Sequence, residues 1–393
     1  MKEVEDFHRI AEVLRSAQRA AIEVENAPDR RKRLRSFSVQ EVAILLGISP
    51  RDLRKALPAG RSAPQRARLS FAEVQDLRAH VADAPPPRLR RTSSGANVLP
   101  AVVFTNFKGG SAKTTSSVHF AQYMALAGRR VLLVDLDSQG SATAQFGIDP
   151  SSEVGRGSSF AAWVLARETG EAVGAEPLCQ ATYWPTIDLV PAGAILAEAE
   201  ESLSRRAGSG RAEGTLYFEE LAAFLAGVTG RYDLAVVDTR PDVNMLMTAA
   251  LHAATGVVVP TRATMVDLAS TGEFFAHLAG YVAEFRSAFG RGLDAAFTRI
   301  LVSAYDPTDR SQEALVALLR DRFGEAVLPG EFLHSRVMGT AGFGKETLYE
   351  YEPSTDRAAY NRVLASANAV NRAIEAELLR ACGQPVPAME RVA

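Results

Sequence analysis

The pattern of apolar and polar positions divides the chain into three segments. In residues 4–24 apolar side chains recur every three to four positions, which predicts an amphipathic helix within residues 1–28. Its narrow stripe would pack either on a second copy of the helix or on the chain's own domain. From residue 98 onward, short apolar runs alternate with helical stretches, at 98–105, 131–135, 187–190, 234–238, 257–260 and 300–304. This alternation predicts an α/β fold with a mainly parallel, doubly wound sheet.

Between these segments, residues 36–82 contain three helix-start signals. Each is a Ser followed three residues later by an acidic residue, a pairing that caps helix N-termini. A tight turn at Leu46-Gly47-Ile48-Ser49 separates the first two helices, as in a helix-turn-helix. We therefore predict a small helical DNA-binding domain over 36–82. The three pairs are Ser38 with Glu41, Ser49 with Asp52, and Ser70 with Glu73.

The second of these helices is the expected reader of the DNA major groove. Arg51, Arg54 and Lys55 lie on one face, while Leu53, Ala56 and Leu57 would face inward. A following stretch could touch backbone phosphates as a short wing or loop. The alternative is a docking module whose charges only keep it soluble. The arginines of the wing stretch are Arg61, Arg66 and Arg68.

Charge supports a nucleic-acid partner for the N-terminal part. Residues 1–97 hold 19 Lys and Arg against 12 Asp and Glu, whereas the rest of the chain holds 25 against 34. Residues 83–97, with three consecutive prolines, predict a linker. The two cysteines are too few for a disulfide framework, and no apolar run is long enough for a membrane span. We therefore expect a cytoplasmic protein.

The strongest chemical signal follows the first apolar run of the large domain. Residues 102–105 lead through a glycine pair into a helix that starts with Lys-Thr. Amides at a helix start attract phosphate, glycines allow close approach, and a Lys-Thr pair supplies a cation and a hydroxyl for Mg²⁺. The strict GxxxxGK[ST] pattern fails because Phe107 and Ala112 replace its glycines. The candidate nucleotide-binding residues are Gly109, Gly110, Ser111, Ala112, Lys113, Thr114 and Thr115.

Three motifs together resemble the ParA/MinD ATPases. Lys108-Gly109-Gly110-x-x-Lys113-Thr114 resembles their deviant Walker A motif, in which a second lysine opens the loop. Residues 134–140 are similar to the family's DxDPQ segment, and residues 232–239 look like its Walker B strand. The helix-turn-helix and residues 345–350 resemble the plasmid partition proteins ParA/RepA, of the RepA branch of repABC-type replicons. The chain departs from the family pattern at Ala112, Ser138 and Arg240.

The resemblance implies a fold of the P-loop NTPase type, with an ATPase domain at 98–382 and a tail at 383–393. It implies ATP and Mg²⁺ as cofactors. Lys113 would neutralise the β- and γ-phosphates, Asp137 would orient the attacking water, and Lys108 would reach the partner's phosphates across a dimer interface. The metal residues would be Thr114, Asp135 and Asp238.

The function implied is ATP-dependent DNA partitioning, in which ATP drives dimerisation and DNA binding and hydrolysis resets the protein. Expected partners are operator DNA, non-specific nucleoid DNA and a ParB/RepB-like centromere-binding protein, with no membrane. The N-terminal module would also repress the chain's own operon. Candidates for the non-specific DNA surface are Arg336, Lys345, Arg357, Arg362 and Arg372.

Three other readings remain open. A MinD-like membrane-positioning ATPase would need a basic amphipathic C-terminal helix, but residues 371–380 carry balanced charges. An electron-transfer ATPase similar to the nitrogenase iron protein would need closely placed cysteines, whereas Cys179 and Cys382 are far apart in sequence. A transcriptional repressor that only senses ATP would show no hydrolysis response to DNA and partner.

Overall fold

The computed structural model describes residues 32–46, 48–57, 68–81, 88–93, 96–208, 216–338, 346–353 and 356–386, and the single positions 9, 12, 13 and 16. The chain divides into two compact units, Met1–Leu34 and Arg35–Ala393. The four single positions of the first unit are helical. Most of the predicted N-terminal helix, and positions 387–393 of the predicted tail, lie outside the described residues.

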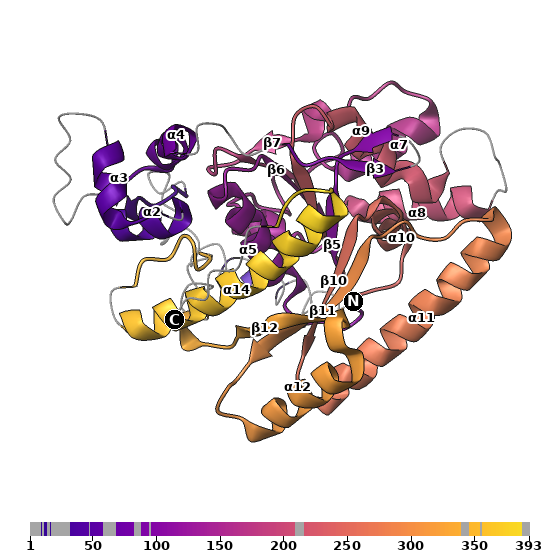
Figure 1. Cartoon of the computed structure of the whole chain (residues 1–393). Helices are drawn as coiled ribbons and strands as arrows, with labels where there is room; N and C mark the ends of the chain where they lie inside the picture. The colour runs from indigo at the N-terminus through magenta and orange to yellow at the C-terminus, as the bar shows by residue number, and fades with distance from the viewer. Residues whose placement is uncertain are drawn as a thin grey trace. The chain divides into compact units, whose positions relative to one another are not determined.

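The second unit is built on one eight-stranded sheet with the order β12-β11-β10-β5-β9-β6-β8-β7 (Figure 1). Every neighbouring pair is parallel except β7 and β8. The predicted fold class is confirmed, and all six predicted runs contribute to strands. The strands are β5 (Ala101–Phe104), β6 (Val131–Leu136), β7 (Gln180–Ala181), β8 (Ile187–Val190), β9 (Leu234–Thr239), β10 (Gly256–Arg262), β11 (Phe297–Tyr305) and β12 (Val327–Leu333).

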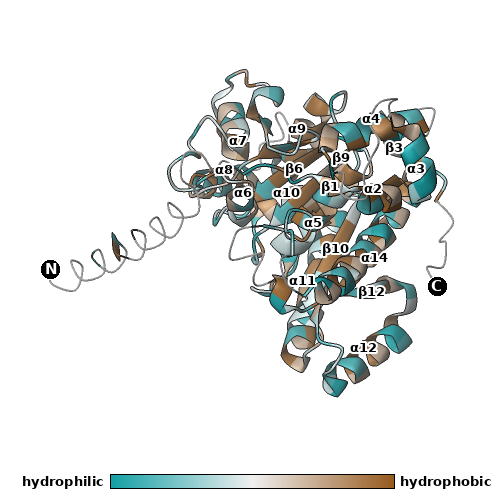
Figure 2. Cartoon of the chain, turned by 90° about the vertical axis from the view of Figure 1, so that its left-hand side faces the viewer, coloured by the Kyte–Doolittle hydropathy of each residue, from teal (hydrophilic) through white to brown (hydrophobic). Residues whose placement is uncertain are grey.

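Helices cover both faces of this sheet. Side chains of a strand alternate between the two faces, and alternate residues of β5 contact different helices. Ala101 and Val103 join the core formed with α7 to α10, whereas the ring of Phe104 meets Phe120 of α5. The strands at the centre of the sheet are strongly apolar, while α3 and α12 show mostly hydrophilic positions (Figure 2). The helices of this part are α5 (Lys113–Leu126), α6 (Ser141–Gln145), α7 (Phe160–Thr169), α8 (Leu196–Gly208), α9 (Glu220–Val228), α10 (Met245–Ala253), α11 (Met265–Phe289), α12 (Arg310–Phe323) and α14 (Arg357–Ala381), with short 3₁₀ turns η2 (Glu176–Leu178), η3 (Tyr217–Glu219) and η4 (Gly324–Ala326).

A small module precedes the sheet domain, and its elements are β1 (Phe37–Ser38), α2 (Val39–Leu46), α3 (Pro50–Ala56), β2 (Arg68–Leu69) and α4 (Phe71–Val81). The three predicted helix caps are confirmed. Leu53 and Leu57 are buried as predicted, whereas Ala56 is partly exposed. In each cap the Ser hydroxyl accepts from the N–H of the acidic residue: Ser38 from Glu41 at 3.3 Å, Ser49 from Asp52 at 3.1 Å, and Ser70 from Glu73 at 3.3 Å.

The predicted linker is wrong for its second half. Residues 91–93 and 96–98 form an antiparallel pair, β3 (Arg91–Ser93) and β4 (Ala96–Val98). Arginines of this segment bind the sheet domain: Arg90 donates to the carbonyls of Thr229 and Tyr232, and Arg91 pairs with Asp294 at 3.0 Å. Because these donors satisfy carbonyl groups beyond α9, residues 88–98 belong to the sheet domain.

Candidate nucleotide-binding site and DNA-facing helix

The loop between β5 and α5 has an open backbone at its two glycines. Gly109 and Gly110 are exposed, and a Cβ atom added at either one would meet nothing within 4 Å. Gly110 has a φ of +72°, which glycine adopts without strain. The loop follows a central strand at its carboxyl end, where parallel sheets bind ligands. Its amides are therefore accessible to an anion.

Ala112, immediately before α5, has left-handed backbone geometry, with φ 68° and ψ 29°. A side chain in this region costs about 1 kcal/mol relative to glycine. The sequence showed that alanine replaces a glycine here, but it could not give the sign of φ. The substitution therefore carries backbone strain at the start of the helix that forms one side of the loop.

Lys113 is the first residue of α5, and its side chain folds back over the loop. Its Nζ donates to the carbonyl of Lys108 at 2.9 Å, and the residue is only 6% exposed. Burial lowers the pKa of Lys113 to about 8, although Asp238 and Asp137 oppose this shift. The ammonium therefore remains charged at neutral pH, next to the backbone of the glycine pair.

Thr114 joins the loop to the neighbouring strand. Its hydroxyl donates to Oδ2 of Asp238 at 2.7 Å. Asp238 lies near the carboxyl end of β9 and is paired in register with Phe104 of β5. The strand order therefore places the hydroxyl and the carboxylate within hydrogen-bond distance, although 124 positions separate them in sequence.

Two more carboxylates from the end of β6 lie close to Asp238. Asp135 is in register with Asp238 and accepts from the hydroxyl of Thr143 at 2.8 Å and from the N–H of Asp137 at 3.0 Å. Burial raises the pKa of Asp135, and burial followed by the charge of Asp135 raises the pKa of Asp238. The arrangement concentrates negative charge where a cation would be stabilised.

These residues fit a magnesium ion bound together with phosphate. Oδ1 of Asp238 is buried and has no hydrogen-bond partner among the described residues. Across the described ranges, no three His, Cys, Asp or Glu side chains group closely enough to hold a metal unaided. Mg²⁺ is commonly held by one or two carboxylates, waters and the phosphates of a substrate, so this donor set is sufficient.

Lys108, the other candidate lysine, differs from Lys113. Its backbone N–H donates to the side chain of Asn106 at 3.2 Å. Its half-buried side chain makes no hydrogen bond or ion pair with any residue of the described ranges. Among the described residues, the ammonium of Lys108 is therefore not engaged by the loop that it opens.

Several residues support the loop without a signal in the sequence. The hydroxyl of Ser303 on β11 donates to the carbonyl of Ser111 at 2.8 Å, and Asn106 donates to the carbonyl of Pro260 at 2.8 Å. The hydroxyl of Thr143 holds Asp135, as described above. The contacts of Ser303 and Asn106 join distant parts of the chain, whereas Thr143 and Asp135 are eight positions apart without forming a recognisable motif.

The predicted reader helix presents its cations to solvent. Arg51, Arg54 and Lys55 on α3 are all exposed. Lys55 pairs with Asp52 at 3.0 Å, whereas Arg51 and Arg54 make no hydrogen bond or ion pair with the residues that the structure describes. The geometry of α3 is thus compatible with the predicted DNA-facing surface.

The other residues predicted to contact DNA differ in exposure and in their contacts within the chain. Arg68 does not lie with the α3 cations as a free group: it donates to Ser36 and pairs with Glu352. Arg61, Arg66 and Lys345 lie outside the described residues. Of the weaker candidates, Arg336 has contacts within the chain, and three on α14 are exposed, namely Arg357, Arg362 and Arg372.

Comparison with known proteins decides the family. The model of the AAA domain family AAA_31 matches residues 100–288. A replication protein A from Sinorhizobium fredii is 34% identical over 88% of this chain and 87% of its own length. The chromosome-partitioning ATPase Soj of Thermus thermophilus is 33% identical over 67% of this chain and 92% of its own. The chain belongs to the ParA/MinD family.

A solved structure extends this likeness to the fold of nearly the whole chain. A partition protein of known structure superposes with a TM-score of 0.63, 17% identity, and coverage of 96% of this chain and all of its own. The likeness in fold thus reaches beyond the ATPase domain of the ParA/MinD family. Among the described helices, none combines the length and apolar composition required to cross a bilayer.

Proposed function

We propose that this chain is a DNA-partitioning ATPase that binds Mg²⁺ and ATP at the loop of residues 108–115. One observation carries the proposal: Lys113, Thr114 and Asp238 meet at the carboxyl end of the central strands, beside an open pair of glycines. This arrangement provides a cation, a hydroxyl and a carboxylate around a cradle of backbone amides. Such a set binds a nucleoside triphosphate with magnesium.

Each loop residue has a proposed role. The amides of residues 109–115 hold the phosphate oxygens, and Lys113 neutralises their charge. Thr114 and Asp238 would hold the metal, with Asp135 supporting them. Bound Mg²⁺ would supply further charge neutralisation at the transferring phosphate. Asp137, which is 8% exposed, orients the attacking water.

The free ammonium of Lys108 supports a dimer that is completed by nucleotide. Lys108 has no partner in the described part of its own chain, so we propose that it binds the phosphates held by a second copy. Two protomers then enclose two ATP molecules, and ATP hydrolysis separates the protomers. The energy of nucleotide binding is thereby converted into a change of DNA affinity.

DNA binding is proposed in two modes. Arg51 and Arg54 on α3, with Lys55 beside them, would read an operator through the major groove and repress the chain's own operon. The ATP dimer would bind nucleoid DNA without sequence preference. A ParB/RepB-like centromere-binding protein would stimulate hydrolysis, and the protein would be cytoplasmic and associated with the nucleoid.

Sedimentation velocity with and without nucleotide tests this function. We expect monomers without nucleotide, dimers with Mg-ATP, and loss of the dimer when EDTA removes the metal. DNA and the centromere-binding protein together should raise the hydrolysis rate. A hydrolysis rate unchanged by both would favour a repressor that only senses ATP.

The MinD-like alternative requires an apolar helix face that is free for lipid. In α14 the apolar side is already covered, since Tyr360, Val363, Val370, Ile374 and Leu378 are buried. Co-sedimentation with anionic vesicles in the presence of Mg-ATP should therefore be negative. A nucleotide-dependent positive result would replace partitioning with membrane positioning.

A further inference from the structure

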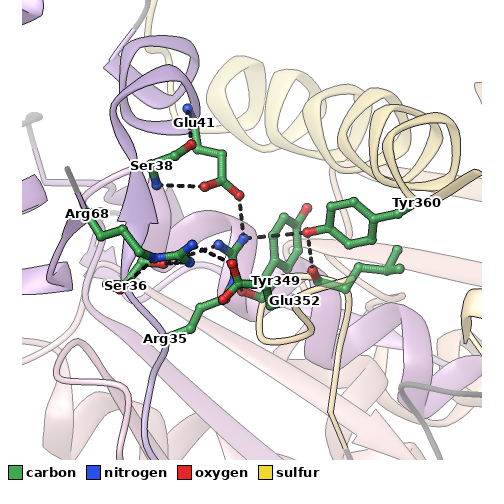
Figure 3. A network of polar contacts seen from close by, with 9 residues as sticks. Arg35, Ser36, Ser38, Glu41, Arg68, Tyr349, Glu352 and Tyr360 are labelled. Atoms are coloured by element: carbon green, nitrogen blue, oxygen red, sulfur yellow. Dashed lines mark hydrogen bonds and ion pairs between the residues drawn. The ribbon is translucent and has the colours of Figure 1, made fainter. Parts of the chain in front are cut away.

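Two arginines of the small N-terminal module, residues 35–81, bind the segment 346–353 of the sheet domain. Arg35 donates through Nε to the carbonyl of Tyr349 at 2.9 Å and through Nη2 to the hydroxyl of Tyr360 at 3.5 Å (Figure 3). The same guanidinium pairs with Glu41, in the first turn of α2, at 2.8 Å. Arg35 therefore links the start of the module to both the segment and α14.

A second arginine makes a parallel connection. Arg68 on β2 pairs with Glu352 of the segment and donates to the hydroxyl of Ser36 at 2.9 Å (Figure 3). Arg35 and Arg68 thus bind opposite ends of residues 349–352. We call this set of contacts, made by Arg35, Arg68, Tyr349, Glu352 and Tyr360, the clamp.

The segment that receives the clamp is anchored on α5, the helix that begins at the nucleotide loop. Glu350, only 7% exposed, accepts from Gln122 of α5 at 2.8 Å, from Trp184 at 2.9 Å and from the N–H of Thr347 at 2.9 Å. A buried carboxylate with this many donors is fixed in place. Gln122 therefore joins residues 347–350 directly to α5.

His119 supplies a second anchor, closer to the loop. Its Nε2 accepts from the N–H of Leu348 at 3.1 Å, and its Nδ1 contacts the carbonyl of Thr115 at 2.6 Å. Because Nε2 accepts, Nδ1 carries the proton, and burial keeps the ring neutral by lowering the pKa of His119 to about 4. Thr115 adjoins Thr114, which contacts Asp238, so hydrogen bonds connect the nucleotide loop to the clamp.

The module also touches the far end of α5. Arg78 of α4 donates to the carbonyl of Leu126, and Gln75 donates to the carbonyl of Ala125 at 3.3 Å. These carbonyls belong to the last turn of α5, where helix carbonyls lack partners of their own. The module therefore contacts both the end of the nucleotide-loop helix and the segment anchored on that helix.

From these contacts we infer that the clamp couples nucleotide binding at the loop to the position of the α3 reader helix, and so to operator affinity. The inference rests on the proposed function, because it requires that the loop bind nucleotide. A shift of α5 when phosphate binds moves residues 347–350 through Glu350 and His119. Arg35 and Arg68 transmit that shift to the module, whose DNA affinity changes accordingly.

The test measures operator affinity in each nucleotide state, using a duplex selected from random-sequence DNA by the full chain. For the wild-type chain we expect Kd values with and without Mg-ATP to differ by at least about fivefold, the lower end of ordinary coupling. The variant Glu352→Gln/Tyr360→Phe changes neither the DNA face nor the nucleotide loop. In this variant the ratio of the two Kd values should fall below about twofold.

Glu331→Gln is the matched control, because Glu331 pairs with Arg320 on the surface at 2.5 Å, away from the clamp contacts. This variant should keep the wild-type ratio. Equal operator affinity in all nucleotide states of the wild-type chain, or a wild-type ratio in Glu352→Gln/Tyr360→Phe, would overturn the inference. Titration of the chain with Mg-ATP in the absence of DNA tests the proposed function separately. A failure of nucleotide binding can therefore be distinguished from a failure of coupling through the clamp.

Trp184 offers a second measurement that does not depend on DNA. Its ring meets Phe71 of α4 edge-on at 5.9 Å, and its Nε1 donates to Glu350. In a Trp163→Phe background, Trp184 is the remaining tryptophan and reports on this contact. Mg-ATP should change its fluorescence, and Glu352→Gln/Tyr360→Phe should reduce that change at least about twofold. A change unaffected by these substitutions would contradict coupling through the clamp.

Discussion

The nucleotide loop and the α3 helix both carry charged side chains, but the surroundings of these charges are opposite. Lys113 is 6% exposed and Asp238 is fully buried, and each makes a hydrogen bond to a specific atom of the chain. Arg51 and Arg54 on α3 are exposed, with no partner among the described residues. The charges of the first region are held in place by the chain itself, whereas those of the second are not held by any described residue.

This difference predicts two kinds of response to substitution. Removing one partner of a buried, charged hydrogen bond leaves the other without a partner, which costs more than the bond itself. Removing an exposed cation loses one contact and its share of released counterions. Substitutions in the loop should therefore abolish activity, whereas those on α3 should act in graded, salt-dependent steps.

Lys108 is an exception to this comparison, because it belongs to the loop but its side chain has no hydrogen-bond or ion-pair partner among the residues that the structure describes. We expect Lys108→Ala to leave Mg-ATP affinity within about threefold of wild type and to lower the hydrolysis rate about a thousandfold, as for other cations supplied in trans. Steady-state ATPase assays with the centromere-binding protein measure this. Arg310→Ala is the control, since it removes an exposed cation on α12 that has no proposed role. Normal hydrolysis and plasmid segregation in Lys108→Ala would refute the trans role.

Substitutions on α3 test the exposed charges of the comparison. Arg51→Ala and Arg54→Ala should each weaken operator binding by about 1–3 kcal/mol if the side chain contacts a base. Fluorescence anisotropy with a labelled operator at two salt concentrations measures the loss and its salt dependence. Arg310→Ala, an exposed arginine on α12, is the control. Undiminished affinity in both α3 variants would move the recognition surface elsewhere.

The smallest expected effect lies at Ala112, whose φ of 68° is strained for a residue with a side chain. Ala112→Gly should raise the free energy of unfolding by about 1 kcal/mol. Ala127→Gly is the matched control: at a φ of −74° the same change should lower stability by about 0.5 kcal/mol. Urea denaturation of both variants measures the difference. A lower free energy of unfolding in Ala112→Gly would contradict the proposal that the backbone at Ala112 is strained.

The sheet and the loop could be predicted from sequence because their signals are local. Six apolar runs and one glycine-lysine-threonine loop are each read from a few adjacent residues. β12 escaped prediction because Pro329 and Gly330 interrupt its apolar pattern. The hairpin at 91–98 escaped because the arginines at its start bind distant groups: Arg90 donates to the carbonyls of Thr229 and Tyr232, and Arg91 pairs with Asp294.

The polar network behind the site could not be predicted for the same reason. Glu350 and Gln122 lie 228 positions apart, and nothing in the neighbourhood of Glu350 indicates a buried carboxylate. Arg68 is predicted from the sequence to be a DNA contact of the wing. It instead pairs with Glu352, a distant residue that no local pattern connects to it. Local patterns thus identify the ligand-binding loop, whereas the connections between domains depend on tertiary contacts.

Isothermal titration calorimetry of Mg-ATP into the full chain tests the central claim most directly. We predict one ATP per protomer, at least about a hundredfold weaker binding in Lys113→Gln, and a marked loss of affinity when EDTA removes the metal. No binding heat in the wild-type chain, or equal affinity in Lys113→Gln, would show that this loop does not hold the nucleotide.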